Sequence, residues 1–95
     1  MYKAIWNQKI IARSDKTIEI EGNQYFPQES VNQEYLKSSP QKTVCSWKGD
    51  CSYYDLEVDG KTNPAAAWYY ANPKEAAIRI KDYIAFWKGV TVVKA

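Results

Sequence analysis

The stretch Cys51–Gly60, CSYYDLEVDG, carries the clearest structural pattern in the chain. From Ser52 to Val58 the even-numbered side chains fall on one face of an extended chain, and the odd-numbered side chains fall on the other. Asp59-Gly60 is a dipeptide typical of two-residue hairpin turns. This period of two predicts a β-strand over residues 51–58 that reverses direction at the Asp-Gly pair.

The segments around this strand are short and separated by turn residues, which favours further strands. Asn7-Gln8 predicts a tight hairpin between strands at 2–6 and 9–13, and turns are expected at 14–16 and 21–23. We expect the remaining strands over residues 17–20, 24–26, 42–48, 65–71, 83–87 and 90–93.

Two segments predict short helices. Ser30 followed by Gln33 fits a capping box, so we expect a helix from Ser30 to Lys37. Asn72-Pro73-Lys74-Glu75 combines an N-cap residue, a proline at the first helical position and an early glutamate, which predicts a second helix that runs through Ile80. The sum is a mainly β (α+β minor) fold of about eight short strands with two short helices.

The length and the net charge of the chain limit the classes of protein to which it could belong. A chain of 95 residues predicts a single domain over 1–95 with one modest core. Thirteen Lys and Arg against eleven Asp and Glu leave a net charge of +2, so charge gives no reason to expect nucleic acid or a membrane surface as partner. The unusual features are eight Tyr, four Trp and two Phe, and the absence of histidine.

The missing histidine excludes Ser-His-Asp and Cys-His catalysis and imidazole metal ligands. Two cysteines alone cannot build a four-ligand zinc site, so we expect no metal and no cofactor. The longest apolar run, residues 65–71, is far too short for a membrane span, and the polar residues after Trp6 argue against a signal peptide. We therefore expect a soluble, cytoplasmic protein with reduced thiols.

The densest candidate site is the segment Cys45–Tyr54. There Lys48 would offer a point charge, Gly49 a close backbone approach, and Trp47 or Tyr53 a stacking face for an anion or a planar ring. The alternative is that Lys48-Gly49-Asp50 is a solvated turn and the aromatic side chains are core packing. A disulfide between Cys45 and Cys51 fits the spacing, but two buried small side chains suit a reducing compartment better.

A second aromatic cluster consists of Ala67–Tyr70 with Pro73, together with Tyr83, Phe86 and Trp87. Alternation places Trp68 and Tyr70 on one face and Tyr69 on the other. Any of these side chains that stay exposed would form an aromatic wall for a planar ligand or a partner chain.

Several of these motifs together resemble the small bacterial family called domain of unknown function 427. The most specific of them is the Cys-x-x-Lys-Gly-x-x-x-Tyr-Tyr element over residues 45–54. This chain has Ser46 where the family commonly has proline, and Cys51 where alanine is usual. The other motifs, in order, are NQKIIARS at 7–14, Tyr25-Phe26-Pro27 with Glu29 and Val31, Ala67-Trp68 with Pro73, and Ile84-Ala85-Phe86.

The resemblance implies a β-tent-like architecture, shared with methionine sulfoxide reductase B and the Mss-type zinc chaperones. The zinc-binding cysteines of those proteins are not matched here. The family also carries the label nucleotidyltransferase-like, but the Gly-Ser and paired aspartates expected of such enzymes are missing from this sequence.

The leading hypothesis is a domain that binds a small molecule or peptide in an aromatic-lined pocket around the Cys45-x-x-Lys48-Gly49 turn. The expected site residues are Cys45, Trp47, Lys48, Gly49, Tyr53, Tyr54 and Trp68, with Tyr25, Phe26 and Pro27 at the rim. One alternative is an enzyme for a nucleotide-like substrate, in which Lys48 has a depressed pKa or Cys45 acts as a thiolate. The other is an interaction module, such as a homodimer that buries the surplus aromatic side chains.

Overall fold

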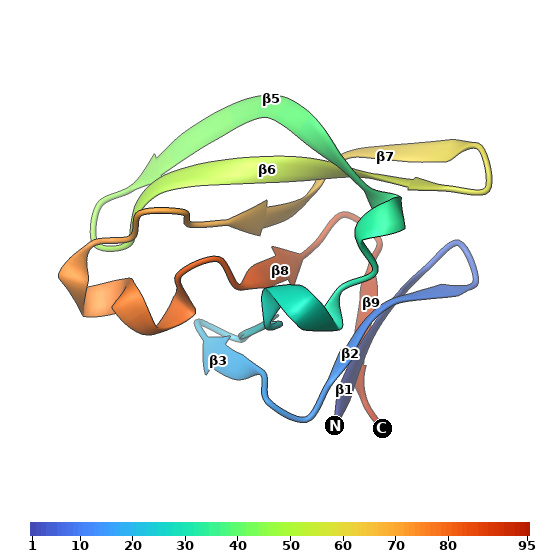
Figure 1. Cartoon of the computed structure of the whole chain (residues 1–95), viewed down its shortest axis with the longest axis horizontal. Coiled ribbons are helices and arrows are strands. Elements are labelled where there is room, and N and C mark those ends of the chain that lie inside the picture. Colours follow the sequence, from blue (N-terminus) through green and yellow to red (C-terminus); the bar gives the residue numbers. More distant parts are fainter.

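Three antiparallel sheets form the computed structural model, which describes all residues from Met1 to Ala95 (Figure 1). The largest sheet has the order β5-β6-β7-β8, the second has the order β2-β1-β9, and β3 pairs with β4 alone. The strands are β1 (Tyr2–Trp6), β2 (Lys9–Ser14), β3 (Ile18–Ile20), β4 (Asn23–Tyr25), β5 (Leu36–Cys45), β6 (Gly49–Val58), β7 (Lys61–Tyr69), β8 (Ile84–Phe86) and β9 (Thr91–Lys94). The prediction of a mainly β fold is confirmed.

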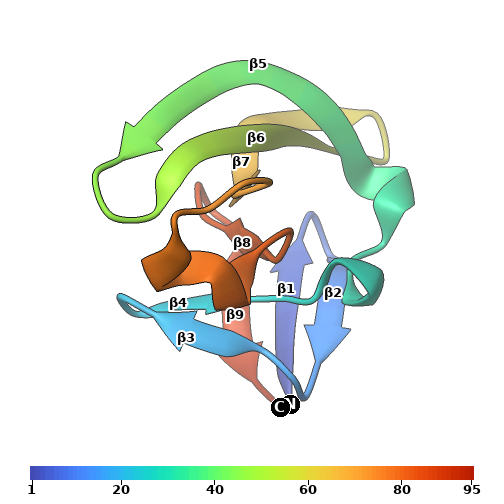
Figure 2. The ribbon, with the colours of Figure 1, turned by 60° about the vertical axis from the view of Figure 1, so that its left-hand side comes forward.

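The sheets enclose two buried clusters. β5 arches over β6 and β7, while the β1-β2-β9 sheet and the β3–β4 hairpin lie on the opposite side of the molecule (Figure 2). The larger cluster contains Phe26, Leu56 and Phe86, and the smaller one contains Tyr25, Tyr70 and Ile80.

The predicted strand at 51–58 lies within β6, and its two faces serve the two clusters. On one face Leu56 belongs to the larger cluster and Tyr54 packs against it, whereas on the other Cys51 belongs to the smaller cluster and Tyr53 packs against it. The Asp59-Gly60 turn joins β6 to β7 with positive φ at both residues, 50° and 78°. Period-two alternation therefore set the orientation of the aromatic side chains as predicted.

The prediction of a helix from Ser30 to Lys37 is wrong. Two short 3-10 helices, η1 (Gln28–Ser30) and η2 (Gln33–Tyr35), occupy its first part, and β5 begins at Leu36. The Ser30 hydroxyl donates to the Pro27 carbonyl at 2.6 Å and does not cap a helix. The local hydrogen bond of this serine thus stabilises a tight turn instead.

β5 is also longer than the predicted strand over 42–48. It lies at the edge of its sheet, and its register with β6 shifts between Ser38 and Lys42. Pro40 falls within that shift, where a missing backbone N–H costs no ladder hydrogen bond. Pro40 therefore lies inside one arched strand.

The second predicted helix is shortened to the 3-10 helix η3 (Glu75–Ile80), which is kinked at Ala77. Asn72 does not cap it; the residue before the helix is Lys74, whose backbone N–H donates to the Lys48 carbonyl at 2.8 Å. The start of this segment is therefore tied to the β5–β6 turn, and the tertiary contact overrides the local helix signal.

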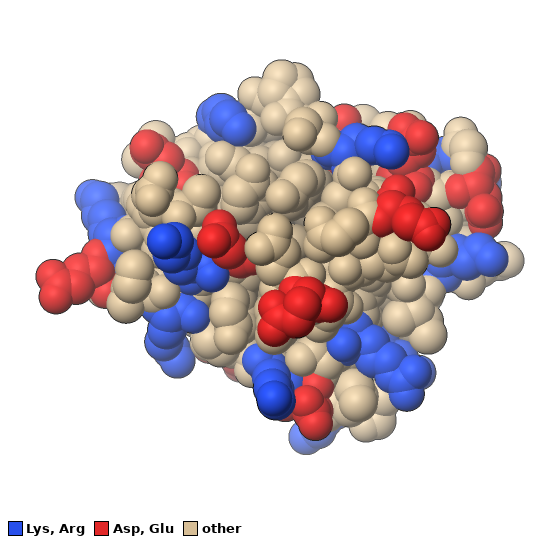
Figure 3. Space-filling model, in the orientation of Figure 1, with Lys and Arg blue, Asp and Glu red and all other residues tan.

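No helix in the structure combines the length and hydropathy needed to cross a lipid bilayer. On the face in Figure 3, basic and acidic side chains are interspersed and neither sign forms a continuous patch.

Candidate functional site

Lys48 lies at the end of the turn between β5 and β6, and its side chain is only 8% exposed. Its ammonium Nζ donates to Glu21 Oε1 at 2.5 Å. The same nitrogen lies 5.3 Å from the ring centre of Trp47 and 5.6 Å from that of Tyr70. Lys48 is thus a buried cation held by one carboxylate and two aromatic faces, and not a solvated turn residue.

The partner of this cation comes from a distant turn. Glu21 and Gly22 form the two-residue turn between β3 and β4, both with positive φ, 54° and 80°. The hydrogen bond and charge of Lys48 hold the pKa of Glu21 below its usual value. The Glu21 side chain itself remains 56% exposed, so the pair joins a buried cation to a carboxylate at the surface.

The ion pair determines the protonation of Lys48. Burial acts to lower the pKa of Lys48, but the hydrogen bond from the ammonium to Glu21 and nearby acidic groups outweigh it, and the net pKa lies above the usual value. A lysine held protonated is a poor general base and a poor amine nucleophile. The raised pKa argues against the alternative in which Lys48, with a depressed pKa, takes part in an enzyme reaction.

Lys48 is one of the residues that line a cavity of about 150 Å³. An apolar cavity of about this size holds one benzene-sized ring. Five of the six side chains that line it are apolar or aromatic, and the sixth is the lysine. The lining residues are Lys48, Cys51, Tyr53, Trp68, Tyr70 and Trp87.

Strand pairing brings the aromatic walls together. Tyr53 of β6 lies opposite Trp68 of β7, and alternation puts Tyr70 on the same face as Trp68. Trp87 follows β8, and its ring centre lies 5.8 Å from that of Trp68 and 6.4 Å from that of Tyr53. Tryptophan and tyrosine side chains from three segments therefore surround one small cavity.

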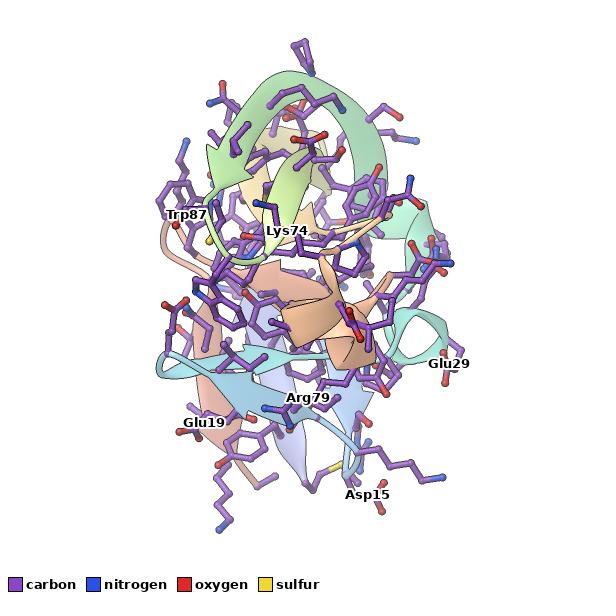
Figure 4. The ribbon with its side chains drawn as sticks, turned by 90° about the vertical axis from the view of Figure 1, so that its left-hand side faces the viewer. Asp15, Glu19, Glu29, Lys74, Arg79 and Trp87 are labelled. Carbon is purple, nitrogen blue, oxygen red and sulfur yellow. The ribbon has the colours of Figure 1, made fainter.

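Hydrogen bonds hold two of these rings in place. Trp68 Nε1 donates to the hydroxyl of Tyr25 at 3.1 Å, and Tyr25 itself is fully buried. Trp87 Nε1 donates to the Ala65 carbonyl at 2.6 Å. Since the residue Trp87 is 45% exposed, its ring forms the outer wall of the cavity, at one side of the molecule in Figure 4.

Gly49 has a role in packing. Its φ of +111° is a conformation that only glycine adopts readily, and a Cβ there would lie 3.4 Å from the backbone nitrogen of Lys74. Lys74 also donates from Nζ to the Ser46 carbonyl at 2.7 Å, beside the same turn (Figure 4). The glycine allows the chain after β7 to cross close to the β5–β6 turn.

The remaining predicted site residues do not line this cavity. Tyr54 stacks on Tyr69 with ring centres 4.6 Å apart, on the other face of β6. Pro27 is buried at the start of η1, and Cys45 is half-buried against the smaller cluster. Tyr25 lies behind Trp68, so it supports the wall without forming it.

Four residues of the site were not assigned to the Lys48 pocket from the sequence, namely Glu21, Cys51, Tyr70 and Trp87, although Tyr70 and Trp87 belonged to the second aromatic cluster. The alternation of β7 already placed Tyr70 beside Trp68, and Trp87 belongs to the surplus of aromatic residues. Glu21 had no sequence signal, because it lies 27 residues before its partner and looks like an ordinary turn residue.

A second, larger cavity of about 410 Å³ lies between β5, β6 and the segment after β7. Its charged lining residues, Lys42 and Asp50, are exposed. Because no buried charge and no aromatic ring lines it, the smaller cavity is the better candidate site. No three His, Cys, Asp or Glu side chains come close enough together to hold a metal ion.

No curated protein matches the chain at a significant level. The model of the family described as "Domain of unknown function (DUF427)", NTP_transf_9, matches residues 2–94, which is nearly the whole chain. The chain therefore belongs to the DUF427 family, as its motifs had suggested.

Proposed function

We propose that this domain is a binding module that takes up a single planar ring, from a small molecule or from a side chain of a peptide, in the cavity beside Lys48. The proposal is based on one observation: a cavity of about 150 Å³ is lined by four aromatic side chains. Ligand sites of small domains combine apolar and aromatic walls with a few fixed polar groups.

The size of the cavity limits the ligand. A ring of benzene size fills it, whereas a nucleotide would have to leave its sugar and phosphates outside. Edge-to-face and stacked contacts with Trp68 and Trp87 would each stabilise such a ring by about 0.5–1.5 kcal/mol beyond the burial of its area. A single-ring ligand of this size has a Kd on the order of 1 mM.

Benzamide is a suitable neutral probe, and the indole N–H signals of the four tryptophans report on it by NMR. We expect the signals of Trp68 and Trp87 to move with a common Kd, while that of Trp6, which packs against the larger cluster, stays in place. If Trp6 moves as much as Trp68, or if no indole signal moves at about 10 mM benzamide, ten times the expected Kd, the proposal is wrong.

Two adjacent tyrosines provide matched variants. Tyr53 lines the cavity, and Tyr54 lies on the opposite face of the same strand. Tyr53→Leu should weaken benzamide binding several-fold, whereas Tyr54→Leu should leave it unchanged. Equal losses in both variants would contradict the assignment of the cavity as the binding site.

A further inference from the structure

The wall of the proposed ring site contains a cation that already has a partner. Lys48 has three N–H donors, yet its ammonium donates a single hydrogen bond, to Glu21. We infer that Glu21 occupies an anion subsite, and that the natural ligand is an aromatic carboxylate whose own carboxylate replaces Glu21 on Lys48. This inference rests on the proposed function.

The two partners differ in their freedom to move. The Lys48 side chain is 8% exposed and lies against the rings of Trp47 and Tyr70, which fix the position of the cation. The Glu21 side chain is 56% exposed and comes from a turn at the surface. Glu21 can therefore rotate into solvent while the ammonium stays where it is.

A largely buried charge is stabilised by a partner, because burial without one costs free energy. In the free protein Glu21 is that partner. A ligand carboxylate that reaches the cavity beside Lys48 meets two unused N–H donors and can take over the role of Glu21. A neutral ring has no such effect, and a cationic ring meets the ammonium as a like charge.

Charge also indicates which anion fits. Lys48 is the only charged residue that lines the cavity. One cation balances a monoanion, whereas a phosphate monoester carries a charge of about −1.5 to −2 at neutral pH. Lys74, the other lysine close to this turn, is exposed and already donates to the Ser46 carbonyl, so it adds no second charge inside the cavity. The site is matched to a carboxylate attached to a ring.

Benzoate, benzamide and benzamidinium test the inference, because they share one ring and differ in charge. In wild-type protein we expect benzoate to bind more tightly than benzamide, and benzamidinium to bind most weakly, as followed by the indole signals of Trp68 and Trp87. In Glu21→Gln, benzoate should bind about fivefold more tightly, because the competing carboxylate is gone, while benzamide binding stays constant.

Glu19→Gln is the matched control, since it removes the same charge from an exposed residue of β3 (Figure 4). The Glu19 carboxylate accepts a hydrogen bond from Gln24, whereas the ion-pair partner of Lys48 is Glu21. Its benzoate affinity should equal that of the wild type. Lys48→Met should reduce benzoate binding to the level of benzamide, provided that the indole signals show a folded protein.

The outcomes separate this inference from the proposed function. If benzamide binds but Glu21→Gln gains no more affinity for benzoate than Glu19→Gln does, the anion subsite is refuted and the ring site stands. If none of the three probes moves the signals of Trp68 and Trp87 in the wild type or in Glu21→Gln, both are refuted.

Discussion

Replacing Lys48 by alanine and by methionine separates the contribution of its hydrocarbon chain from that of its charge. Alanine removes both, whereas methionine keeps an unbranched apolar side chain of similar length. Because the side chain is 8% exposed and packs between Trp47 and Tyr70, the two variants should differ strongly in their free energy of unfolding.

The magnitude follows from the burial of Lys48. Truncation to alanine removes three methylene groups beyond Cβ, which at about 0.8 kcal/mol for each buried methylene corresponds to about 2.4 kcal/mol. The charge contributes less, because the cost of taking an ammonium out of water offsets much of its attraction to a carboxylate and to aromatic faces. We therefore expect Lys48→Ala to lose about 2–3 kcal/mol and Lys48→Met to lose less than about 1 kcal/mol.

Urea unfolding followed by tryptophan fluorescence and by circular dichroism measures both values. A loss of 2–3 kcal/mol in a domain of this size lowers the Tm by about 10–20 °C, so thermal unfolding provides an independent check. The two variants should unfold with the same dependence on urea as the wild type, because the exposed surface of the unfolded chain hardly changes.

One result would refute this reasoning. If Lys48→Met is destabilised as strongly as Lys48→Ala, the ammonium itself stabilises the fold, and the link from Lys48 to the β3–β4 turn is structural. Glu21 would then be a structural partner of Lys48, and not a group that a ligand displaces.

Three further predictions concern the same region. Stability should fall as the pH rises above 10. The pKa of Lys48 in the folded protein lies above its usual 10.5, and burial raises the pKa of Tyr70 above its usual 10.0, so the unfolded chain loses these protons first and alkali favours it. Urea midpoints that are constant from pH 8 to 11 would contradict this prediction. Gly49→Ala should cost about 1–3 kcal/mol, because its φ of +111° is a conformation that residues with a Cβ rarely adopt, and unchanged thermal unfolding would show that the backbone there relaxes freely. Trp68→Phe should cost about 1–3 kcal/mol through loss of the indole donor and of part of the ring. When Tyr25→Phe is added to the same chain, it should not add its full separate cost, because the two side chains share one hydrogen bond. Additive losses in a double-mutant cycle would rule out that bond.

The strands could be predicted wherever a local period of two was strong. Residues 51–58 alternate regularly, and the Asp59-Gly60 pair supplies a turn with positive φ at both positions, so β6 and its hairpin follow from the chain alone. The same alternation correctly placed Tyr53 and Tyr54 on opposite faces.

The helical segments could not be predicted in the same way. The capping patterns at Ser30 and at Asn72 are real local preferences, but the first competes with another local hydrogen bond and the second with a tertiary contact. Ser30 bonds the Pro27 carbonyl, and the chain after Asn72 is tied to the Lys48 carbonyl through the backbone of Lys74. Short helices are marginal by themselves, so such contacts decide the outcome.

The sequence by itself determined a mainly β domain and the faces of β6, because alternation depends on neighbours two residues apart. It also showed the concentration of aromatic residues near Lys48. Only the tertiary structure decided that Lys48 is buried, that Glu21 is its partner and that Trp87 lines the cavity, while Tyr54 and Pro27 lie elsewhere. The physical reason is that the site joins distant segments, such as those of Glu21 and Lys48, 27 residues apart, which meet only when sheets pack. The charge of a lysine is visible in a sequence, but its desolvation exists only after folding.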